Sequence, residues 1–572
     1  MKFLIKKINI ILFSLTIFLN QSESLARDNN ALYTRENISN YFLGIISAKR
    51  DHNREALKYL KKVESLKNVH SEFNNEFIKT LILLDKFEEA FEFSKNIWDE
   101  NQLFFEADLL LGLEAFIIED YKSAEKYFQR LNKLSRTNLF FDNFIGNILI
   151  SWSKASQGEK ENSFKILEKI PKPYHNLRKT QYSFLKCYFD DKDTQKVFEE
   201  IIQFKDYNFE RYNFFLANYF LSKAQNEKAK KFIINSREKH SSNLLIKQTK
   251  NFLLNKKYKK IKNIFNCKNP RDSIAEFFYV IANLYSSEKD YKSSNFYLKI
   301  SYFLNKEFLT NKALLAENLY YQRKLVSSKN IYNSLKSIGP IYSWYASKSI
   351  ASILIKEKGI EESVKFIEKE FNSLSDPNFE HYYELANFYK DNQYYEKSVK
   401  YYSLALKEIN EDHFLFPKIL DRRGTSYERL GDWKKAEKDL MGSLKILPDQ
   451  AHVLNYLAYS WVDKGINLDR GLEMLIKANK IRKQDGYIID SLGWAYYAKK
   501  NYIEAEKHLQ KAVELLPTDP IINDHYADVL WMLNKNIQAR YVWNYVLNLD
   551  GTEQDLKDRI SKKLIFGIVK KL

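Results

Sequence analysis

The stretch from Tyr487 to Pro517, YIIDSLGWAYYAKKNYIEAEKHLQKAVELLP, places the strongest constraint on the fold of this chain. Small residues stand at Gly493 and Ala505, and large apolar residues surround them at helical spacing. Small side chains at two such places let antiparallel helices approach each other closely. Pro517 lacks an N–H group and cannot continue the second helix. The stretch therefore predicts a pair of antiparallel helices.

The same pattern recurs along nearly the whole chain. Aligned on the residue that opens the second helix, fifteen units span 483 residues in fourteen intervals, about 34.5 residues each. This period and the Leu-Gly-x2-Tyr, Ala and Pro signature resemble the tetratricopeptide repeat (TPR). The resemblance implies an all-α fold, a TPR α-solenoid that forms a right-handed superhelix of about fifteen helix-turn-helix units with a C-terminal capping helix. The aligning residues are Ala56, Ala90, Ala124, Ser163, Gln195, Ala229, Ile261, Ser294, Ser328, Ser363, Ser398, Ala436, Gly471, Ala505 and Ala539.

Conformity to the repeat pattern varies along the chain and suggests segments. We expect an N-terminal array over residues 37–269, degenerate over 141–269, followed by middle units over 270–375. The best-conforming units occupy residues 376–551, and an apolar stripe over 552–572 predicts the capping helix.

The first 26 residues have the features of an export leader. Lys2, Lys6 and Lys7 precede a twelve-residue apolar stretch, and Ser24-Leu25-Ala26 offers small residues where a signal peptidase reads them. We expect a signal peptide over residues 1–26 and export to the periplasm. The alternative is an uncleaved leader that holds the protein at the membrane, although the apolar stretch is shorter than the ~20 residues that span a bilayer.

The basic composition carries little functional information. The net charge of +18 would suit nucleic acid, anionic lipid or an acidic polymer. The chain is also rich in Lys, Asn, Ile, Phe and Tyr, the residues of AT-rich codons. Because exported proteins rarely meet nucleic acid, we expect no nucleic-acid partner.

Cys187 and Cys267 are the only cysteines, and they fall in different repeat units. An exported protein could join them in a disulfide. Since a stacked array is expected to hold separate units far apart, we predict two buried free thiols instead.

The sequence lacks the constellations that catalysis needs. It contains no H-E-x-x-H, no Gly-rich phosphate loop followed by Lys and Ser or Thr, no G-x-S-x-G, and no His, Cys and Asp cluster at metal-ligand spacing. We therefore expect a protein that is not an enzyme, with no catalytic residue, no metal and no cofactor.

A helical solenoid offers a long concave surface lined by the first helix of each unit. In TPR proteins the second, fifth, ninth and twelfth positions of the unit face it. In the last three units these positions combine aromatic rings with carboxylates and an amide, which suits a neutral or basic protein or peptide segment. The alternative is that several of the rings pack between neighbouring first helices. The predicted groove residues are Asn455, Tyr459, Asp490, Trp494, Tyr497, Asp524, Asp528 and Trp531.

Residues 451–550 resemble the C-terminal part of a family of exported TPR proteins of Gram-negative bacteria, through NYLAYSWVDKGINLDRGLEMLIKA, DGYIIDSLGWAYY and DPIINDHYADVLW. Some members are outer-membrane lipoproteins that act as adaptors for a periplasmic carboxyl-terminal processing protease and deliver cell-wall hydrolases to it. The resemblance implies a scaffold or adaptor of the cell envelope with an envelope protease or cell-wall hydrolase as partner. No lipidation Cys follows the leader, which departs from those members. The alternatives are an assembly factor for an envelope complex and a peptidoglycan or polysaccharide binder, with peripheral membrane contact as a further option.

Overall fold

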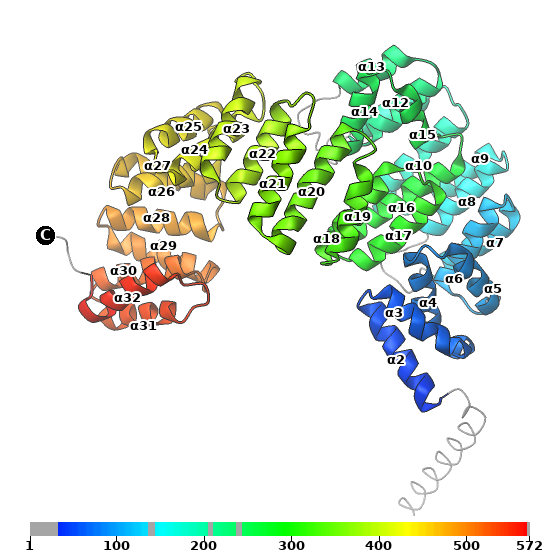
Figure 1. The fold of residues 1–572 in the computed structure, drawn as a ribbon, viewed down its shortest axis with the longest axis horizontal. Coiled ribbons are helices and arrows are strands. Elements are labelled where there is room, and N and C mark those ends of the chain that lie inside the picture. Colours follow the sequence, from blue (N-terminus) through cyan, green and yellow to red (C-terminus); the bar gives the residue numbers. More distant parts are fainter. Residues whose placement is uncertain (1–32, 135–143, 204–209, 236–242, 569–572) are drawn as a thin grey trace, which may run out of the picture. The chain divides into compact units, whose positions relative to one another are not determined.

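The computed structural model describes residues 33–134, 144–203, 210–235 and 243–568. These residues form 31 α-helices, α2 to α32, with two short 3-10 segments and no strand within the described ranges (Figure 1). The predicted signal peptide lies outside the described residues. Within these ranges, no helix combines the length and apolarity required to cross a membrane.

The helices form fifteen successive pairs, and α32 follows the last pair, which confirms the predicted all-α TPR solenoid with its capping helix. The first eight pairs are α2 (Arg35–Lys49) with α3 (Asn53–Leu60), α4 (Ser71–Leu83) with α5 (Phe87–Ile97), α6 (Phe105–Ile117) with α7 (Tyr121–Leu134), α8 (Phe144–Ser156) with α9 (Lys160–Glu168), α10 (His175–Tyr188) with α11 (Thr194–Ile202), α12 (Tyr212–Ser222) with α13 (Asn226–Asn235), α14 (Leu244–Leu254) with α15 (Tyr258–Ile264), and α16 (Pro270–Ser287) with α17 (Tyr291–Leu304).

The remaining pairs are more regular in length. They are α18 (Leu309–Tyr321) with α19 (Leu325–Leu335), α20 (Pro340–Lys358) with α21 (Ile360–Asn372), α22 (Phe379–Asp391) with α23 (Tyr395–Lys407), α24 (Phe416–Arg429) with α25 (Trp433–Ile446), α26 (Ala451–Asp463) with α27 (Leu468–Ile481), α28 (Gly486–Ala498) with α29 (Tyr502–Leu515), and α30 (Pro520–Met532) with α31 (Asn536–Leu547), followed by α32 (Gln554–Phe566).

The two helices of a pair are joined by a turn that contains a left-handed residue. This residue usually stands five positions before the aligning residue, as Asp85 (φ 61°) does before Ala90 and Lys500 (φ 63°) before Ala505. A left-handed residue after a helix lets the chain reverse while it satisfies the last carbonyl groups of that helix. Only six of the eighteen positive-φ residues in the described ranges are glycines, so that most turns bear the steric cost of a Cβ.

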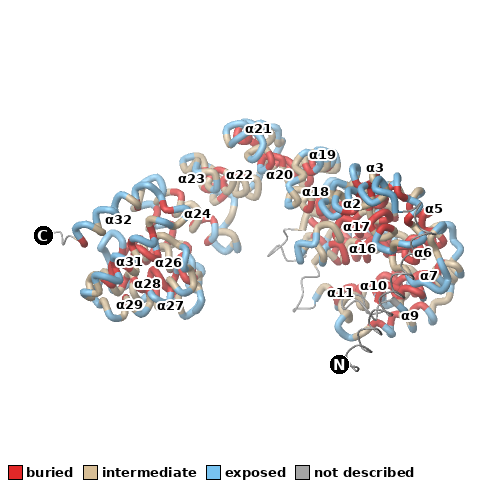
Figure 2. The backbone as a smooth tube through the Cα atoms, turned by 90° about the horizontal axis from the view of Figure 1, so that it is seen from below, coloured by how far each residue is buried: buried red, intermediate tan, exposed pale blue. Residues whose placement is uncertain are grey.

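Close helix approach explains the small residues of the pattern. Ala90 and Ala505 have no exposed surface, and a Cβ built on Gly493 would lie 2.6 Å from Leu509 Cγ. Figure 2 shows how buried positions, in red, recur along the helices of the array. The sequence pattern therefore reports the contact between the two helices of each pair.

The helices group into two compact units, which we call the N-terminal unit (up to Glu370) and the C-terminal unit (from Phe371). The N-terminal unit returns on itself, because α17 packs against α4. Lys292 Nζ lies 2.8 Å from Glu76 Oε2, and the rings of Phe87 and Phe303 stack with centroids 4.0 Å apart. Contacts between residues more than 200 positions apart therefore join the first pairs of this unit to its later ones.

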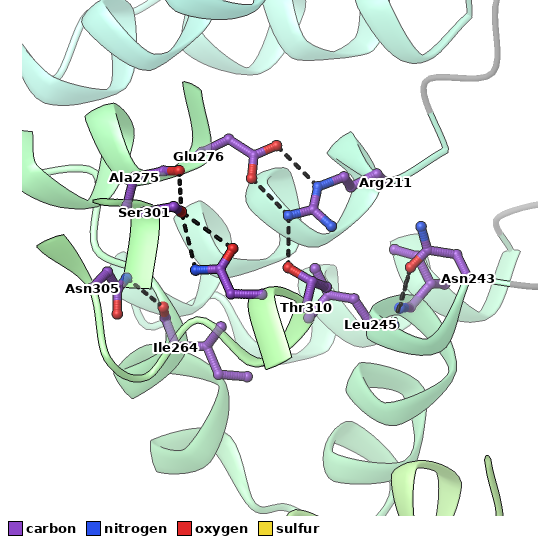
Figure 3. A network of polar contacts seen from close by, with 11 residues as sticks. Arg211, Asn243, Leu245, Ile264, Ala275, Glu276, Ser301, Asn305 and Thr310 are labelled. Atoms are coloured by element: carbon purple, nitrogen blue, oxygen red, sulfur yellow. Dashed lines mark hydrogen bonds and ion pairs between the residues drawn. The ribbon is translucent and has the colours of Figure 1, made fainter. Parts of the chain in front are cut away.

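A buried ion pair joins the start of α12 to α16 in the N-terminal unit (Figure 3). Arg211 donates from Nε and Nη2 to the two oxygens of Glu276, at 2.9 and 2.6 Å, and from Nη2 to Thr310 Oγ1 at 3.2 Å. The guanidinium also lies 4.2 Å from the ring centroid of Tyr279. Because Glu276 has no exposed surface, loss of Arg211 would leave a buried charge without its partner.

The prediction of two free thiols is wrong, because Cys187 and Cys267 form a disulfide with a Cα–Cα distance of 5.9 Å. Separation along the array does not equal separation in space where the array winds tightly. The end of α10 meets the segment that joins α15 to α16, and the rings of Phe184 and Phe265 lie 5.4 Å apart beside the disulfide. The two sulfurs therefore join units that are two repeats apart.

Candidate functional site: a concave groove in the C-terminal unit

A groove of about 700 Å³ runs across the first helices α24, α26 and α28 of the C-terminal unit. Its lining follows the positional rule for TPR units. Lys418, His452 and Tyr487 are second positions, Asp421 and Asn455 are fifth positions, and Thr425 is a ninth position. The remaining lining residues are Lys390, Phe414, Pro417, Arg422, Leu447, Gln450, Tyr456, Asp485 and Ile488.

The repeat geometry aims these side chains into one groove. Each first helix starts at an equivalent point after the preceding turn, as Asp485 shows by accepting a hydrogen bond from Ile488 N at the start of α28. Positions two, five and nine then lie on one face of the helix, three or four residues apart. Stacked helices with the same start therefore present the same positions side by side.

Polar groups in the groove are arranged in pairs. His452 Nε2 lies 3.0 Å from Asp421 Oδ2, and Arg422 Nη1 donates to Asn387 Oδ1 at 2.6 Å. Tyr456 donates its hydroxyl to Glu428 at 2.7 Å, and burial together with this carboxylate raises the pKa of Tyr456. These side chains are held in place before any ligand arrives.

Two groups in the groove are left without a partner within the described part of the chain. Asn455 Oδ1 is buried and accepts no hydrogen bond. Lys418 is exposed and takes part in none of the ion pairs formed there. A buried acceptor without a donor costs about 1–3 kcal/mol, so a ligand N–H group placed at Asn455 would recover that energy. The groove thus offers one free ammonium group, at Lys418, and one amide side chain, at Asn455, whose oxygen lacks a donor in the free protein.

The structure separates Asn455 from the other predicted groove residues. Tyr459, Trp494 and Tyr497 form an aromatic cluster with His525, in which Trp494 stacks on Tyr497 at 4.5 Å and on His525 at 4.1 Å between centroids. Burial raises the pKa of Tyr459 to about 12. These rings pack between neighbouring first helices, which was the alternative reading of the pattern.

The predicted carboxylates are engaged by groups of the chain itself. Asp490 lies 2.9 Å from His525 Nδ1, while Asp524 and Asp528 both bind Lys563 of α32. Burial lowers the pKa of His525, but the three carboxylates outweigh it, and its pKa is raised above the ordinary value. Burial and Asp524 raise the pKa of Asp528 to about 6.

Trp531, the last predicted residue, lies in the same region as Lys563. Its ring packs on Trp543 with centroids 5.5 Å apart. It also lies against the end of α32, because a Cβ on Gly567 would fall 1.9 Å from Trp531 Cζ2. The groove residues of α24 were not predicted from the sequence, although the same positional rule, applied to the unit directly before the last three, identifies Lys418 and Asp421. Among the described residues, no group of three or more His, Cys, Asp or Glu side chains is placed to hold a metal ion.

Comparison with known proteins supports the repeat assignment. The chain is 28% identical over 165 residues to a TPR repeat-containing protein of Pseudomonas aeruginosa, covering 29% of this chain and 27% of that protein. It is 30% identical over 114 residues to the CTR9 homolog of Arabidopsis thaliana, covering 20% of this chain and 10% of that protein. The chain thus spans about a quarter and a tenth of these two relatives.

Solved structures with similarity include the Cut9–Hcn1 hetero-tetramer of the APC/C, at a TM-score of 0.36 and 14% identity over 95% of this chain and 98% of that chain. Yeast Tom70 has a TM-score of 0.33 and 16% sequence identity, and the match covers 80% of this chain and 94% of Tom70. MamA of Desulfovibrio magneticus has a TM-score of 0.28 and 17% identity, and the match covers 32% of this chain and 99% of that chain. Two segments of the chain, residues 380–412 and 488–519, match the family described as tetratricopeptide repeat.

Proposed function

We propose that this chain is an exported, non-catalytic scaffold or adaptor of the bacterial cell envelope, and that the groove of α24, α26 and α28 binds an extended segment of a partner protein. The buried, unpaired Asn455 Oδ1 carries this proposal, because an extended backbone supplies the N–H donor that it lacks. Exposed rings at the edges of the groove, such as Tyr487 at 58% exposure, add apolar contact area for the partner.

The charges of the groove favour a segment that carries acidic side chains. Lys390, Lys418 and Arg422 outnumber the two carboxylates of the lining, Asp421 and Asp485. Of these carboxylates, Asp421 faces His452 and Asp485 caps α28. The neutral or basic segment expected from Asp490 and Asp524 stays a prediction for the region beyond this groove.

The disulfide supports the proposed export. Disulfides persist in oxidising compartments and are rare in the bacterial cytosol, and this one accompanies a leader-like N-terminal sequence. An envelope protease or cell-wall hydrolase is the partner class that the resemblance of residues 451–550 suggests. Fusion of residues 1–40 to a reporter that is active only in the periplasm tests export, and activity that persists after loss of the apolar stretch would contradict it.

The binding test places a photo-crosslinking amino acid at Tyr487, inside the groove, and at Ile503, which is 74% exposed on α29 and lies outside the groove lining. We expect Tyr487 to give a discrete cross-linked partner in cells and Ile503 to give none. Cross-linking from both positions, or from neither, would contradict the groove.

Substitutions then connect the cross-link to the chemistry. Lys418→Glu and Asn455→Leu should abolish the cross-link from Tyr487 while leaving thermal unfolding unchanged or raised, because Asn455 is unsatisfied in the free protein. The matched control is Lys438→Glu, an exposed lysine of α25 outside the groove lining, which should have no effect.

A further inference from the structure

The capping helix α32 lies on the inner face of the last unit, where it inserts a lysine. Lys563 Nζ lies 2.8 and 2.9 Å from the oxygens of Asp524 and 2.7 and 2.8 Å from those of Asp528. These carboxylates stand at the fifth and ninth positions of α30. The equivalent positions of α24, Asp421 and Thr425, line the open groove.

The inner face of α28 and α30 requires a cation. Asp490, Asp524 and Asp528 are each less than 8% exposed, and within the described ranges their ion-pair partners are His525 and Lys563. Buried carboxylates need a charged, hydrogen-bonded partner to remain ionised. The ammonium group of Lys563 is the charged partner of two of these carboxylates, Asp524 and Asp528.

The attachment of α32 combines apolar packing with the lysine contact, since Leu556 and Ile560 join a core cluster with Leu530, Trp543 and Val546. Only Leu556 and Ile560 are buried among its residues, whereas α30 buries eight. Beyond Lys563 the helix ends with Ile565 and Phe566 at 69% and 70% exposure. A loop containing Gly551 (φ 92°) connects α32 to α31. Leu564 packs partly buried against the same cluster as Leu556 and Ile560, and the lysine contact adds to this packing in holding the helix.

We propose that the inner face of α28 and α30 is a binding site for a lysine-bearing helical segment, and that α32 is its resident, displaceable occupant. Asp524 and Asp528 select the ammonium group, and the Trp531 ring supports the residues that follow it. A partner helix that presents a lysine followed by apolar residues, as Lys563 and Leu564 do, competes with α32 for this face. The inference uses residues outside the groove of α24, α26 and α28 and does not depend on the function proposed for that groove.

The test uses the full chain and a fluorescent peptide with the sequence of residues 554–568. In the wild-type chain the tethered α32 competes at high effective concentration, so that we expect weak binding of the peptide. Lys563→Met removes the resident ammonium, and we expect the peptide to bind this variant at least tenfold more tightly. Hydrogen exchange of residues 554–566 should rise in the same variant.

The neighbouring lysine supplies the control. Lys562 is exposed and has no ion-pair partner among the described residues, and Lys562→Met should behave as the wild type. A peptide that carries the substitution Lys563→Met should lose the tenfold gain. Equal binding to the wild-type and Lys563→Met chains, or an equal gain for both peptides, would overturn the proposal.

A second variant covers the case in which Lys563→Met unfolds the C-terminal unit. Asp524→Asn with Asp528→Asn keeps the volume of both side chains and removes their charge. We expect faster hydrogen exchange in α32 for this double variant, but no gain in peptide binding. Tight binding of the peptide to the double variant would show that the carboxylates do not select the lysine and would also overturn the proposal.

Discussion

The disulfide between Cys187 and Cys267 closes a loop of 80 residues within the N-terminal unit. In the chain-entropy treatment, a cross-link of this span removes about 15 cal/mol/K from the unfolded chain, which is about 4.5 kcal/mol at 25 °C. Because a folded domain is stable by only about 5–15 kcal/mol, this is a large share. We expect reduction of the disulfide to lower the free energy of unfolding of the N-terminal unit by about 4.5 kcal/mol.

Urea unfolding, followed by hydrogen-exchange mass spectrometry, reports the two units separately. Oxidised and fully reduced wild-type protein are compared, since they have the same side chains and differ only in the bond. The C-terminal unit contains no cysteine and should unfold at the same urea concentration in both samples. The double variant Cys187→Ala, Cys267→Ala should not respond to reductant. A change below about 1 kcal/mol in the N-terminal unit would refute the reasoning, because the loop would then add no constraint to the unfolded chain.

Three further predictions concern the C-terminal unit. Lys500→Gly should raise the free energy of unfolding of the C-terminal unit by about 1 kcal/mol, because Lys500 has a left-handed φ of 63°. The control Lys499→Gly, at a φ of −82°, should lower that free energy. Equal effects of the two substitutions in urea unfolding would contradict the prediction. Gly493→Ala should lower the midpoint of thermal unfolding, at a cost of about 1–3 kcal/mol, because its Cβ would lie 2.6 Å from a neighbouring side chain; an unchanged midpoint counts against that contact. Folding raises the pKa of His525 and raises the pKa of Asp528 to about 6. Between the unfolded and the folded pKa of each group, the native state therefore binds more protons than the unfolded chain. Stability from these two groups should therefore fall as pH rises from about 4 through the raised pKa of His525, and His525→Gln or Asp528→Asn should flatten that slope in urea titrations at several pH values.

The repeat architecture could be predicted from sequence because it depends on local residues. A small side chain, such as that of Ala90 or Ala505, is needed at each place where the two helices of a pair touch. These places recur about every 34 residues, so the small residues recur at the same spacing in the sequence. The turns were less visible, because residues such as Asp85, Ala224 and Lys500 occupy the left-handed region without the glycine that would mark it.

Contacts between distant units could not be predicted in the same way. The disulfide and the Arg211–Glu276 ion pair depend on how tightly successive units wind, and each unit contributes a small rotation that no single motif encodes. A charged residue such as Glu276 is ordinary on a helix in sequence, and only its position in the wound array makes it buried.

The sequence predicted which positions of a first helix line the groove, but not which repeat units contribute them. Asn455 lines the open groove, as expected for a fifth position, while Asp524 at the same position of a later unit is covered by Lys563. The difference comes from α32, which lies outside the repeat pattern and therefore outside the positional rule. An apolar stripe predicted that α32 would pack, but it contained no information about which face the helix would cover.

The return of the N-terminal unit on itself has a consequence for folding cooperativity. An open repeat array has contacts only between neighbours and can fold stepwise from any point. Here Lys299 pairs with Asp85 at a separation of 214 residues, and Gln322 donates to Asp51 at a separation of 271. Contacts of such high order slow folding and make distant segments depend on one another. The N-terminal unit should therefore fold late and as one cooperative body. By contrast, α22 to α31 make their main contacts within a pair or with the adjacent pair, and they can assemble pair by pair.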